Sequence, residues 1–126
     1  MKHTTSIIGH VGKDAEMRFT KGDPPKNVTT FSVAAQEGFG NNKKTVWFRV
    51  SAWAKLGETC NQYVKKGMLI SVDGRLNADD NGCPRIWQDS NGKARASFEI
   101  TANEVRFLSK PENAKQEQLL PEDEPY

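Results

Sequence analysis

The segment Val46–Lys55 reads VWFRVSAWAK and interleaves two sets of side chains. Side chains along a β-strand point alternately to its two faces. One face of a strand here would carry only apolar or small residues, namely Val46, Phe48, Val50 and Ala52. The other face would carry aromatic, basic and small polar residues, namely Trp47, Arg49, Ser51, Trp53 and Lys55. The pattern therefore predicts a half-buried strand with tryptophans and cations on its wet face.

The two tryptophans on the wet face indicate what this surface binds. A strand tryptophan is often a packing residue, but Val46, Phe48 and Val50 already supply the core face. Flat aromatic rings interleaved with cations stack exposed bases and neutralise the phosphates between them. We therefore expect a nucleic-acid-binding surface on this strand.

Apolar alternation predicts four further strands around this one. They are Thr4–Val11 with a continuation to Phe19 after a break at residues 12–14, Val28–Gln36, Met68–Leu76 and Ala94–Leu108. The run at residues 21–27 is rich in Gly and Pro and predicts a turn, and the Gly-rich run at 38–42 joins two strands as a hairpin. In the last strand we expect an inward set followed by a shift in register. The inward set is Phe98, Ile100 and Ala102, with Val105 and Phe107 after the shift.

The apolar period changes after Trp53, and the spacing becomes that of one stripe of a helix. The stripe consists of Leu56, Cys60, Tyr63 and Val64. We expect a helix of about three turns with Lys65 and Lys66 in its last turn, where cations complement the helix dipole. Gly67 would follow as the left-handed cap.

The stretch 77–93 contains two Asn-Gly pairs, which are strong hairpin signals. We interpret it as a long excursion with a small ribbon of its own. The chain order is then strand, strand, strand, helix, strand, strand. Five short antiparallel strands with one helix after the third predict an all-β OB-fold, a five-stranded Greek-key barrel that binds oligonucleotides. A barrel of this kind without a nucleic-acid role is the alternative on topology alone.

The charge of the 126-residue chain is unevenly distributed along its length. Residues 1–110 carry 17 lysines and arginines against 11 acids, a net charge of +6, whereas residues 111–126 carry one against five, a net charge of −4. We expect one domain over residues 1–109 and a short flexible acidic tail over 110–126. A basic domain favours polyanionic partners. The tail would dock a partner, compete for the basic surface or simply increase solubility.

The residues needed for catalysis or metal binding are scarce. The only histidines are His3 and His10, the two cysteines Cys60 and Cys83 form no CxxC pair, and Asp79 and Asp80 belong to a turn. No nucleophile has an evident base, so we expect a protein that is not an enzyme and has no cofactor or metal. Two isolated cysteines and a first segment too short for a signal peptide predict a cytoplasmic protein that does not insert in a membrane.

Over residues 4–108 the chain resembles the bacterial-type single-stranded DNA-binding protein family. The matching segments are Ile7–Phe19, Trp47–Val50, Trp53–Leu56, Tyr63–Gly67, Val72–Leu76 and Trp87–Gly92. The resemblance implies sequence-nonspecific binding and protection of single-stranded DNA during replication, recombination and repair. It implies base stacking on four aromatic positions, which are here Phe39, Trp47, Trp53 and Trp87. Duplex DNA should bind poorly, because its bases are already stacked.

Cations close to these aromatics along the strands and loops would contact phosphates, which carry no sequence information. They are Arg49, Lys55, Arg75, Arg85 and Lys93, with Lys13, Arg18, Lys43 and Lys44 as additional contacts. Any one of these lysines would equally serve as ordinary solvated surface. For Trp87 the alternative is a lid folded back on the barrel.

The resemblance also implies a homotetramer, with Phe48 at a position near subunit interfaces where the family often has His. The family's C-terminal tail ends in an acidic tip that docks replication and repair proteins. Here a shortened tip would consist of Glu122, Asp123, Glu124, Pro125 and Tyr126, with Glu124 where an apolar residue is usual. A different class of function stays open, an OB-fold subunit of a primosome complex that uses the barrel chiefly to contact other proteins.

Overall fold

The chain folds into a β-barrel from which three segments project. The computed structural model describes residues 2–109, and the predicted tail tip lies outside these residues. The strands in this range are β1 (Thr5–Val11), β2 (Glu16–Phe19), β3 (Asn27–Glu37), β4 (Lys44–Trp53), β5 (Leu69–Leu76), β6 (Ile86–Gln88), β7 (Ala94–Ala96) and β8 (Phe98–Phe107). The helices are the short 3-10 helix η1 (Gly40–Asn42) and the α-helix α1 (Ala54–Tyr63).

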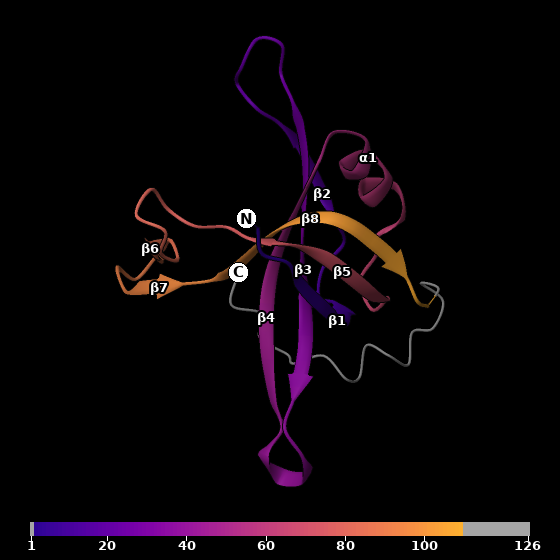
Figure 1. The fold of residues 1–126 in the computed structure, drawn as a ribbon, viewed down its shortest axis with the longest axis vertical. Coiled ribbons are helices and arrows are strands. Elements are labelled where there is room, and N and C mark those ends of the chain that lie inside the picture. Colours follow the sequence, from indigo (N-terminus) through magenta and orange to yellow (C-terminus); the bar gives the residue numbers. More distant parts are fainter. Residues whose placement is uncertain (1, 110–126) are drawn as a thin grey trace.

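Five of the strands close into the barrel. The main sheet has the order β1-β5-β8-β4-β3-β2, and an additional pairing of β1 with β3 closes it (Figure 1). In chain order the closed strands and α1 run β1, β3, β4, α1, β5, β8, which confirms the predicted OB-fold. The expectation that every pair is antiparallel was wrong for β4 and β8, which pair in parallel. Parallel neighbours need a long crossover connection, and α1 with β5 and the excursion supplies it.

The predicted first strand is two strands, because the chain bends at Gly12. β1 pairs with β5 and β3, whereas β2 pairs with β3 alone. The backbone N–H of Gly12 donates a hydrogen bond to the carbonyl of Ser32 at 3.0 Å. This bond holds the bend against β3, directly beneath the surface that the sequence predicts to bind nucleic acids.

The barrel core consists of alternate residues from each strand, as the period of two predicts. Val50, Ile70, Val72 and Ile100 are completely buried, and Ala102 is nearly so. The shift in register predicted for the last strand occurs opposite Asp73 and Gly74.

The inward placement of Phe98 and Phe107 was wrong, because their exposed fractions are 58% and 40%. These residues are the first and last of β8, so they lie where the strand enters and leaves the barrel. Phe98 packs on Phe48 instead, with ring centroids 5.7 Å apart, and Phe107 meets the edge of Tyr63 at 6.2 Å.

The helix has about three turns, as the sequence predicts, but it ends earlier in the chain than expected. Val64 already has an extended backbone, and its N–H donates to the carbonyl of Cys60 at 2.8 Å. Lys65 and Lys66 therefore lie beyond the helix rather than in its last turn. Gly67 has the expected positive φ of 88°, but its N–H donates to Val11 in β1 and serves the return to the barrel.

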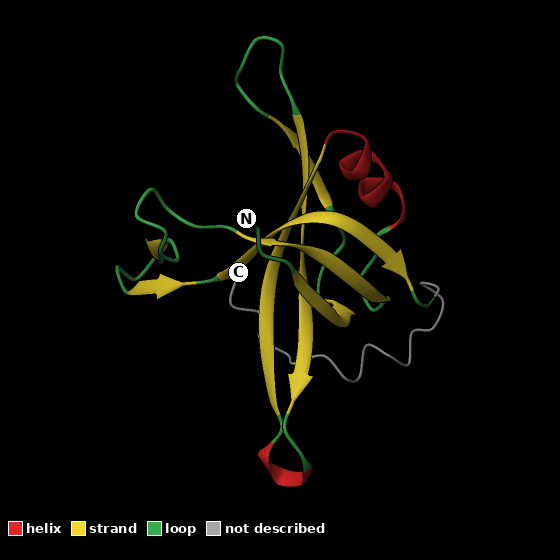
Figure 2. Cartoon of the chain, in the orientation of Figure 1, coloured by secondary structure: helices red, strands yellow, loops and turns green. Residues whose placement is uncertain are grey.

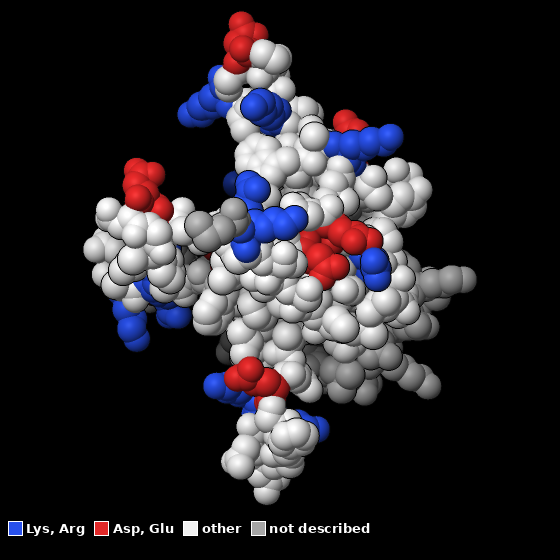
Figure 3. All heavy atoms as spheres, viewed as in Figure 1, with Lys and Arg blue, Asp and Glu red and all other residues white. Residues whose placement is uncertain are grey.

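Three projections extend from the barrel (Figure 2). The β3–β4 hairpin runs beyond it and ends at η1, and the loop between β2 and β3 extends in the opposite direction. A small ribbon is present as predicted, the β6–β7 pair, but its second strand β7 comes from the start of the predicted last strand, which is split because β7 lies in a sheet separate from the main one. On the face shown in Figure 3, lysine and arginine side chains lie on all three projections, beside acidic ones.

Candidate nucleic-acid interface

The wet face of β4 is built as its period predicts. Val50 and Ala52 have no exposed surface, whereas Trp53 is 42% exposed and Trp47 and Arg49 are partly exposed. Residues opposite each other in an antiparallel pair share a face. The face therefore continues onto β3, where Trp47 lies opposite Ala34, Arg49 opposite Ser32, Ser51 opposite Thr30 and Trp53 opposite Val28. The result is a surface of small side chains with two indoles standing on it.

Gly12 supplies part of the floor under Trp47. A Cβ atom at Gly12 would lie 2.6 Å from Cζ3 and 2.9 Å from Cη2 of Trp47, and 2.9 Å from Oγ of Ser32. Such distances are well inside van der Waals contact. The six-membered ring of Trp47 therefore lies directly on the backbone at the bend between β1 and β2, where only glycine leaves room for it.

Trp87 lies on the other side of Trp47. The two indoles, with Lys44, Arg95 and Phe98, line an open pocket of about 280 Å³. The Nε1–H of Trp87 donates to Oγ of Ser97 at 3.0 Å, and the residue is partly buried. The structure thus brings two of the four predicted stacking residues together. Trp87 is neither fully exposed nor folded shut over the barrel.

Trp53 and Phe39 lie farther along the same hairpin. Trp53 is six residues from Trp47, which corresponds to about 20 Å along an extended strand. It is also the N-cap of α1, so Lys55 follows it in the first turn of the helix. Phe39 precedes η1 at the hairpin tip and is 90% exposed. The four aromatics therefore form an extended row with a side branch rather than one pocket.

The predicted phosphate contacts differ in whether an acid already neutralises them. Arg18 pairs with Glu16 at 3.4 Å, Lys44 with Glu37 at 3.0 Å, and Arg85 with Glu99 at 2.9 Å. Lys13 has a contact of its own. The other predicted phosphate contacts form no ion pair within residues 2–109. They are Arg49, Lys55, Arg75, Lys93 and Lys43. These five would meet phosphates without first breaking an ion pair.

Arg49 is the cation most closely integrated with the aromatic row. It lies on β4 between Trp47 and Trp53 and lines an open pocket of about 190 Å³ with Lys13 and Arg18. Asp14 and Glu16 line the same pocket, so its charge is mixed. Three of the nine predicted phosphate contacts therefore converge here, whereas Arg75, Lys93 and Lys43 are dispersed over β5 and two loops.

Sequence reasoning missed Arg95, Ser97 and Glu99. Nε of Arg95 pairs with Asp89 at 2.8 Å, and this hydrogen bond, with backbone N–H groups, holds the pKa of Asp89 below its usual range. The Glu99 carboxylate raises the pKa of Arg85, chiefly through their hydrogen bonds. The alternation of Arg95, Ser97 and Glu99 was a signal for one shared face, but it gave no indication of which loop would meet that face.

Residues 2–109 contain no group of three His, Cys, Asp or Glu side chains placed to hold a metal ion. None of the helices in that range is both long and apolar enough to cross a bilayer.

Comparison with known proteins gives consistent matches. The model of the single-strand binding protein family matches residues 2–108. The single-stranded DNA-binding protein 1 of Chlorobaculum tepidum is 36% identical over 108 residues, which are 81% of this chain and 62% of that protein. The chain thus spans about three fifths of that relative. A protein of the same name from Xylella fastidiosa is 33% identical over 130 residues, with 94% of this chain and 90% of that protein covered.

The fold also has a solved counterpart. The chain from the Plasmodium falciparum SSB complex with ssDNA matches with a TM-score of 0.65 and 23% identity, over 84% of this chain and 94% of the other. This likeness shows the fold, and the family model and the curated relatives show the ancestry. The chain belongs to the single-strand binding protein family.

Proposed function

We propose that this protein binds single-stranded DNA without sequence preference and protects it during replication, recombination and repair. The observation that carries the proposal is the row of Trp47, Arg49 and Trp53 on the outer face of β4, in which two rings flank a cation that forms no ion pair within residues 2–109. Each stacked base contributes about 1 to 3 kcal/mol. The names of the relatives, which are single-stranded DNA-binding proteins, support the same function.

Sequence tolerance follows from the kind of contact that this face offers. Every base has a π-face, so stacking discriminates little among bases. Small side chains lie opposite this row, Ala34 opposite Trp47 and Ser32 opposite Arg49, where long polar groups would be needed to recognise base edges. In a duplex the π-faces are already covered by neighbouring pairs, and exposing them costs energy. Unpaired DNA should therefore bind far better than duplex.

The direct test is to titrate the tryptophan fluorescence of the protein with poly(dT) and with duplex DNA at the same salt concentration. We expect strong quenching by poly(dT) and little by duplex. A Trp47→Ala, Trp53→Ala double variant should lose most of the affinity, whereas Tyr63→Leu on α1 serves as a control, because Tyr63 is an exposed aromatic away from the row. Unchanged affinity in a folded double variant would favour the alternative, an OB-fold subunit that contacts other replication proteins.

We propose further that the protein is a homotetramer. Ile8 and Phe98 are 60% and 58% exposed, and Ile8 lines a shallow pocket of about 220 Å³ with Val46 and Phe48. Exposed apolar patches of this kind support an interface between protein surfaces. Sedimentation should give four chains per particle, and Ile8→Glu should lower that number. Phe19→Glu, with 64% of Phe19 exposed on β2, is the matched control.

The remaining proposals concern residues 110–126 and the cellular setting. We propose that residues 1–109 are one domain, followed by an acidic tail whose last five residues dock replication and repair proteins in the cytoplasm. The support is the charge of the tail, five acids against one lysine in residues 111–126. Replacing Tyr126 by alanine should then reduce the amount of such proteins that co-purify with the chain, with poly(dT) affinity unchanged.

A further inference from the structure

The ribbon that carries Trp87 has little structure of its own to hold it in place. β6 and β7 have three residues each and pair only with one another. An isolated two-stranded hairpin is marginally stable in water. Figure 1 shows the ribbon standing apart from the barrel strands. The position of Trp87 relative to Trp47 must therefore depend on the contacts that join the excursion to the barrel.

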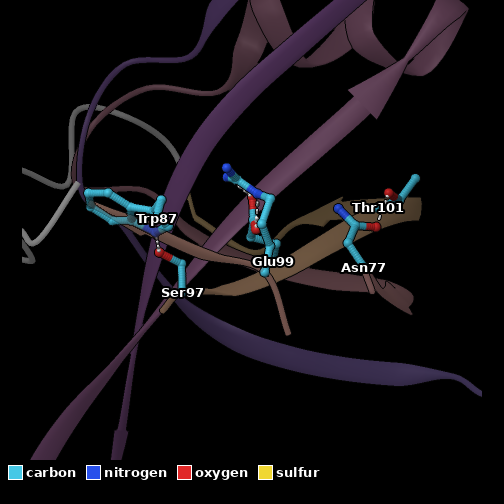
Figure 4. A network of polar contacts seen from close by, with 6 residues as sticks. Asn77, Trp87, Ser97, Glu99 and Thr101 are labelled. Atoms are coloured by element: carbon cyan, nitrogen blue, oxygen red, sulfur yellow. Dashed lines mark hydrogen bonds and ion pairs between the residues drawn. The ribbon is translucent and has the colours of Figure 1, made fainter. Parts of the chain in front are cut away.

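Three side-chain contacts make this connection, beside a backbone hydrogen bond from the N–H of Asn77 to the carbonyl of Glu99 at 2.8 Å, and all three end on alternate residues of one segment, Ser97 to Thr101 (Figure 4). Nε1 of Trp87 donates to Oγ of Ser97 at 3.0 Å. Oγ1 of Thr101 donates to Oδ1 of Asn77 at 2.5 Å, at the start of the excursion. Between these two, Arg85 meets Glu99. The excursion is thus attached at its root, near its middle and at the indole itself.

The Arg85–Glu99 contact is the strongest of the three. Nε and Nη2 of Arg85 donate to the two carboxylate oxygens at 3.1 and 2.9 Å, a two-bond fork. The Glu99 side chain is only 14% exposed, whereas that of Arg85 is 55% exposed. Bidentate charge-assisted pairs combine strength with a defined geometry. Arg85 is two residues before Trp87, so the fork fixes the part of the chain that presents the indole.

Simple electrostatics predicts a different role for these residues. Glu99 lies in register with Arg49 on the neighbouring strand, inside a surface proposed to bind a polyanion. On that basis an acid there would only repel phosphates, and Arg85 would be one more phosphate contact. The two roles make opposite predictions for removal of the Glu99 charge. If Glu99 only repels phosphates, its neutralisation strengthens DNA binding. If Glu99 holds Arg85, its neutralisation releases the ribbon and weakens binding.

We propose that Glu99 and Arg85 are positioning residues, whose ion pair holds the β6–β7 ribbon so that Trp87 faces Trp47 across the pocket. This inference rests on the proposed function for its consequence in DNA binding. A charge unfavourable to DNA is retained in the interface because it orders a stacking platform. Arg85 is consequently occupied by protein and contributes little to phosphate neutralisation.

The test uses the full chain with Trp47→Phe and Trp53→Phe, which leaves Trp87 as the only tryptophan and keeps aromatic rings at the other positions. Glu99→Gln should increase the acrylamide quenching of Trp87 in the absence of DNA. It should also weaken poly(dT) binding by about five-fold or more, as expected for a disordered platform. Glu104→Gln is the matched control, because Glu104 also pairs with an arginine, Arg106 at 2.9 Å, on the same strand.

A charge swap gives a second test, and acrylamide quenching of Trp87 is the readout that a merely electrostatic role would leave unchanged. Arg85→Glu alone should behave like Glu99→Gln, and the double variant Arg85→Glu, Glu99→Arg should return the quenching of Trp87 to that of the parent and restore affinity to within about two-fold, since the pair is re-formed. Because Arg85 is largely exposed, Arg85→Gln tests the same point with little risk to folding.

Two results would overturn the inference. One is a Glu99→Gln protein with unchanged or tighter poly(dT) binding and unchanged acrylamide quenching. The other is an Arg85→Gln protein whose salt dependence falls by about 0.7 while Trp87 is unaffected, as expected for a phosphate ligand on single-stranded DNA. If poly(dT) does not quench the parent at all, stacking on Trp87 fails as part of the proposed function, and the acrylamide measurement still decides the positioning role.

Discussion

Replacing Gly12 by alanine should displace the indole of Trp47 without unfolding the barrel. The new Cβ would lie 2.6 Å from Cζ3 of Trp47, and its three nearest neighbours are all side-chain atoms. Since carbon atoms in contact rest about 3.5 to 4.0 Å apart, the ring must move by roughly 1 Å. Gly12 has no positive φ, so alanine fits the backbone. The perturbation therefore falls on the platform rather than on the fold.

The size of the effect has an upper limit set by the stacking energy. Complete loss of one platform would cost about 1 to 3 kcal/mol, or about 5- to 150-fold in affinity. A displaced ring retains part of its overlap with the base, so we expect a loss of about 1 kcal/mol, close to five-fold. The same displacement should change the emission of Trp47 in the free protein.

The assay is a poly(dT) titration in a chain with Trp53→Phe and Trp87→Phe, which isolates the emission of Trp47. Gly22→Ala is the matched control, because the nearest atom to a Cβ at Gly22 is 3.7 Å away. Urea unfolding of each variant shows whether the barrel is intact. A folded Gly12→Ala protein with unchanged Trp47 emission and unchanged affinity would refute the assignment of Gly12 as the floor of this platform.

Three further outcomes test the core and the electrostatics. Gly74→Ala should destabilise folding by more than Gly12→Ala in urea titrations, because its Cβ would lie 2.1 Å from the backbone oxygen of Thr101 and a strand must move. Burial raises the pKa of the Cys60 thiol from 9.0 to about 11, so the folded state retains a proton that the unfolded chain loses. The free energy of unfolding should therefore begin to fall near pH 9 and be lower by about 2 kcal/mol at pH 11; urea titrations that show the same fall in Cys60→Ala would contradict this. Arg49→Ala should reduce the salt dependence of poly(dT) binding by about 0.7 on a logarithmic plot, since one phosphate contact is lost; an unchanged slope would remove Arg49 from the interface.

Much of the fold was predictable because strand period and turn chemistry are local properties. The split of Val46–Lys55 into a core face and a wet face needed only the two-residue repeat, and the structure confirms it through Val50 and Ala52. The helix after Trp53 and a ribbon near the Asn-Gly pairs were predicted on the same kind of signal, although the second strand of the ribbon was assigned to the last strand. The ends of the strands and the helix were not predicted correctly, as Phe98 and Lys65 show. A strand or helix ends where neighbouring segments no longer cover it, and this depends on the tertiary structure.

The local pattern of residues was enough to identify the side chains available for binding, namely the aromatics and cations that alternate along one strand. Their arrangement depends on the folded barrel. It placed Gly12 under Trp47, brought Trp87 across from it, and joined Arg85 to Glu99 from a strand 14 residues later. Alternation is a property of residues that are neighbours in the chain, whereas these contacts depend on the register between distant strands of a closed barrel. Arg85, which the sequence predicts as a phosphate contact, is already paired with an acid in the folded chain.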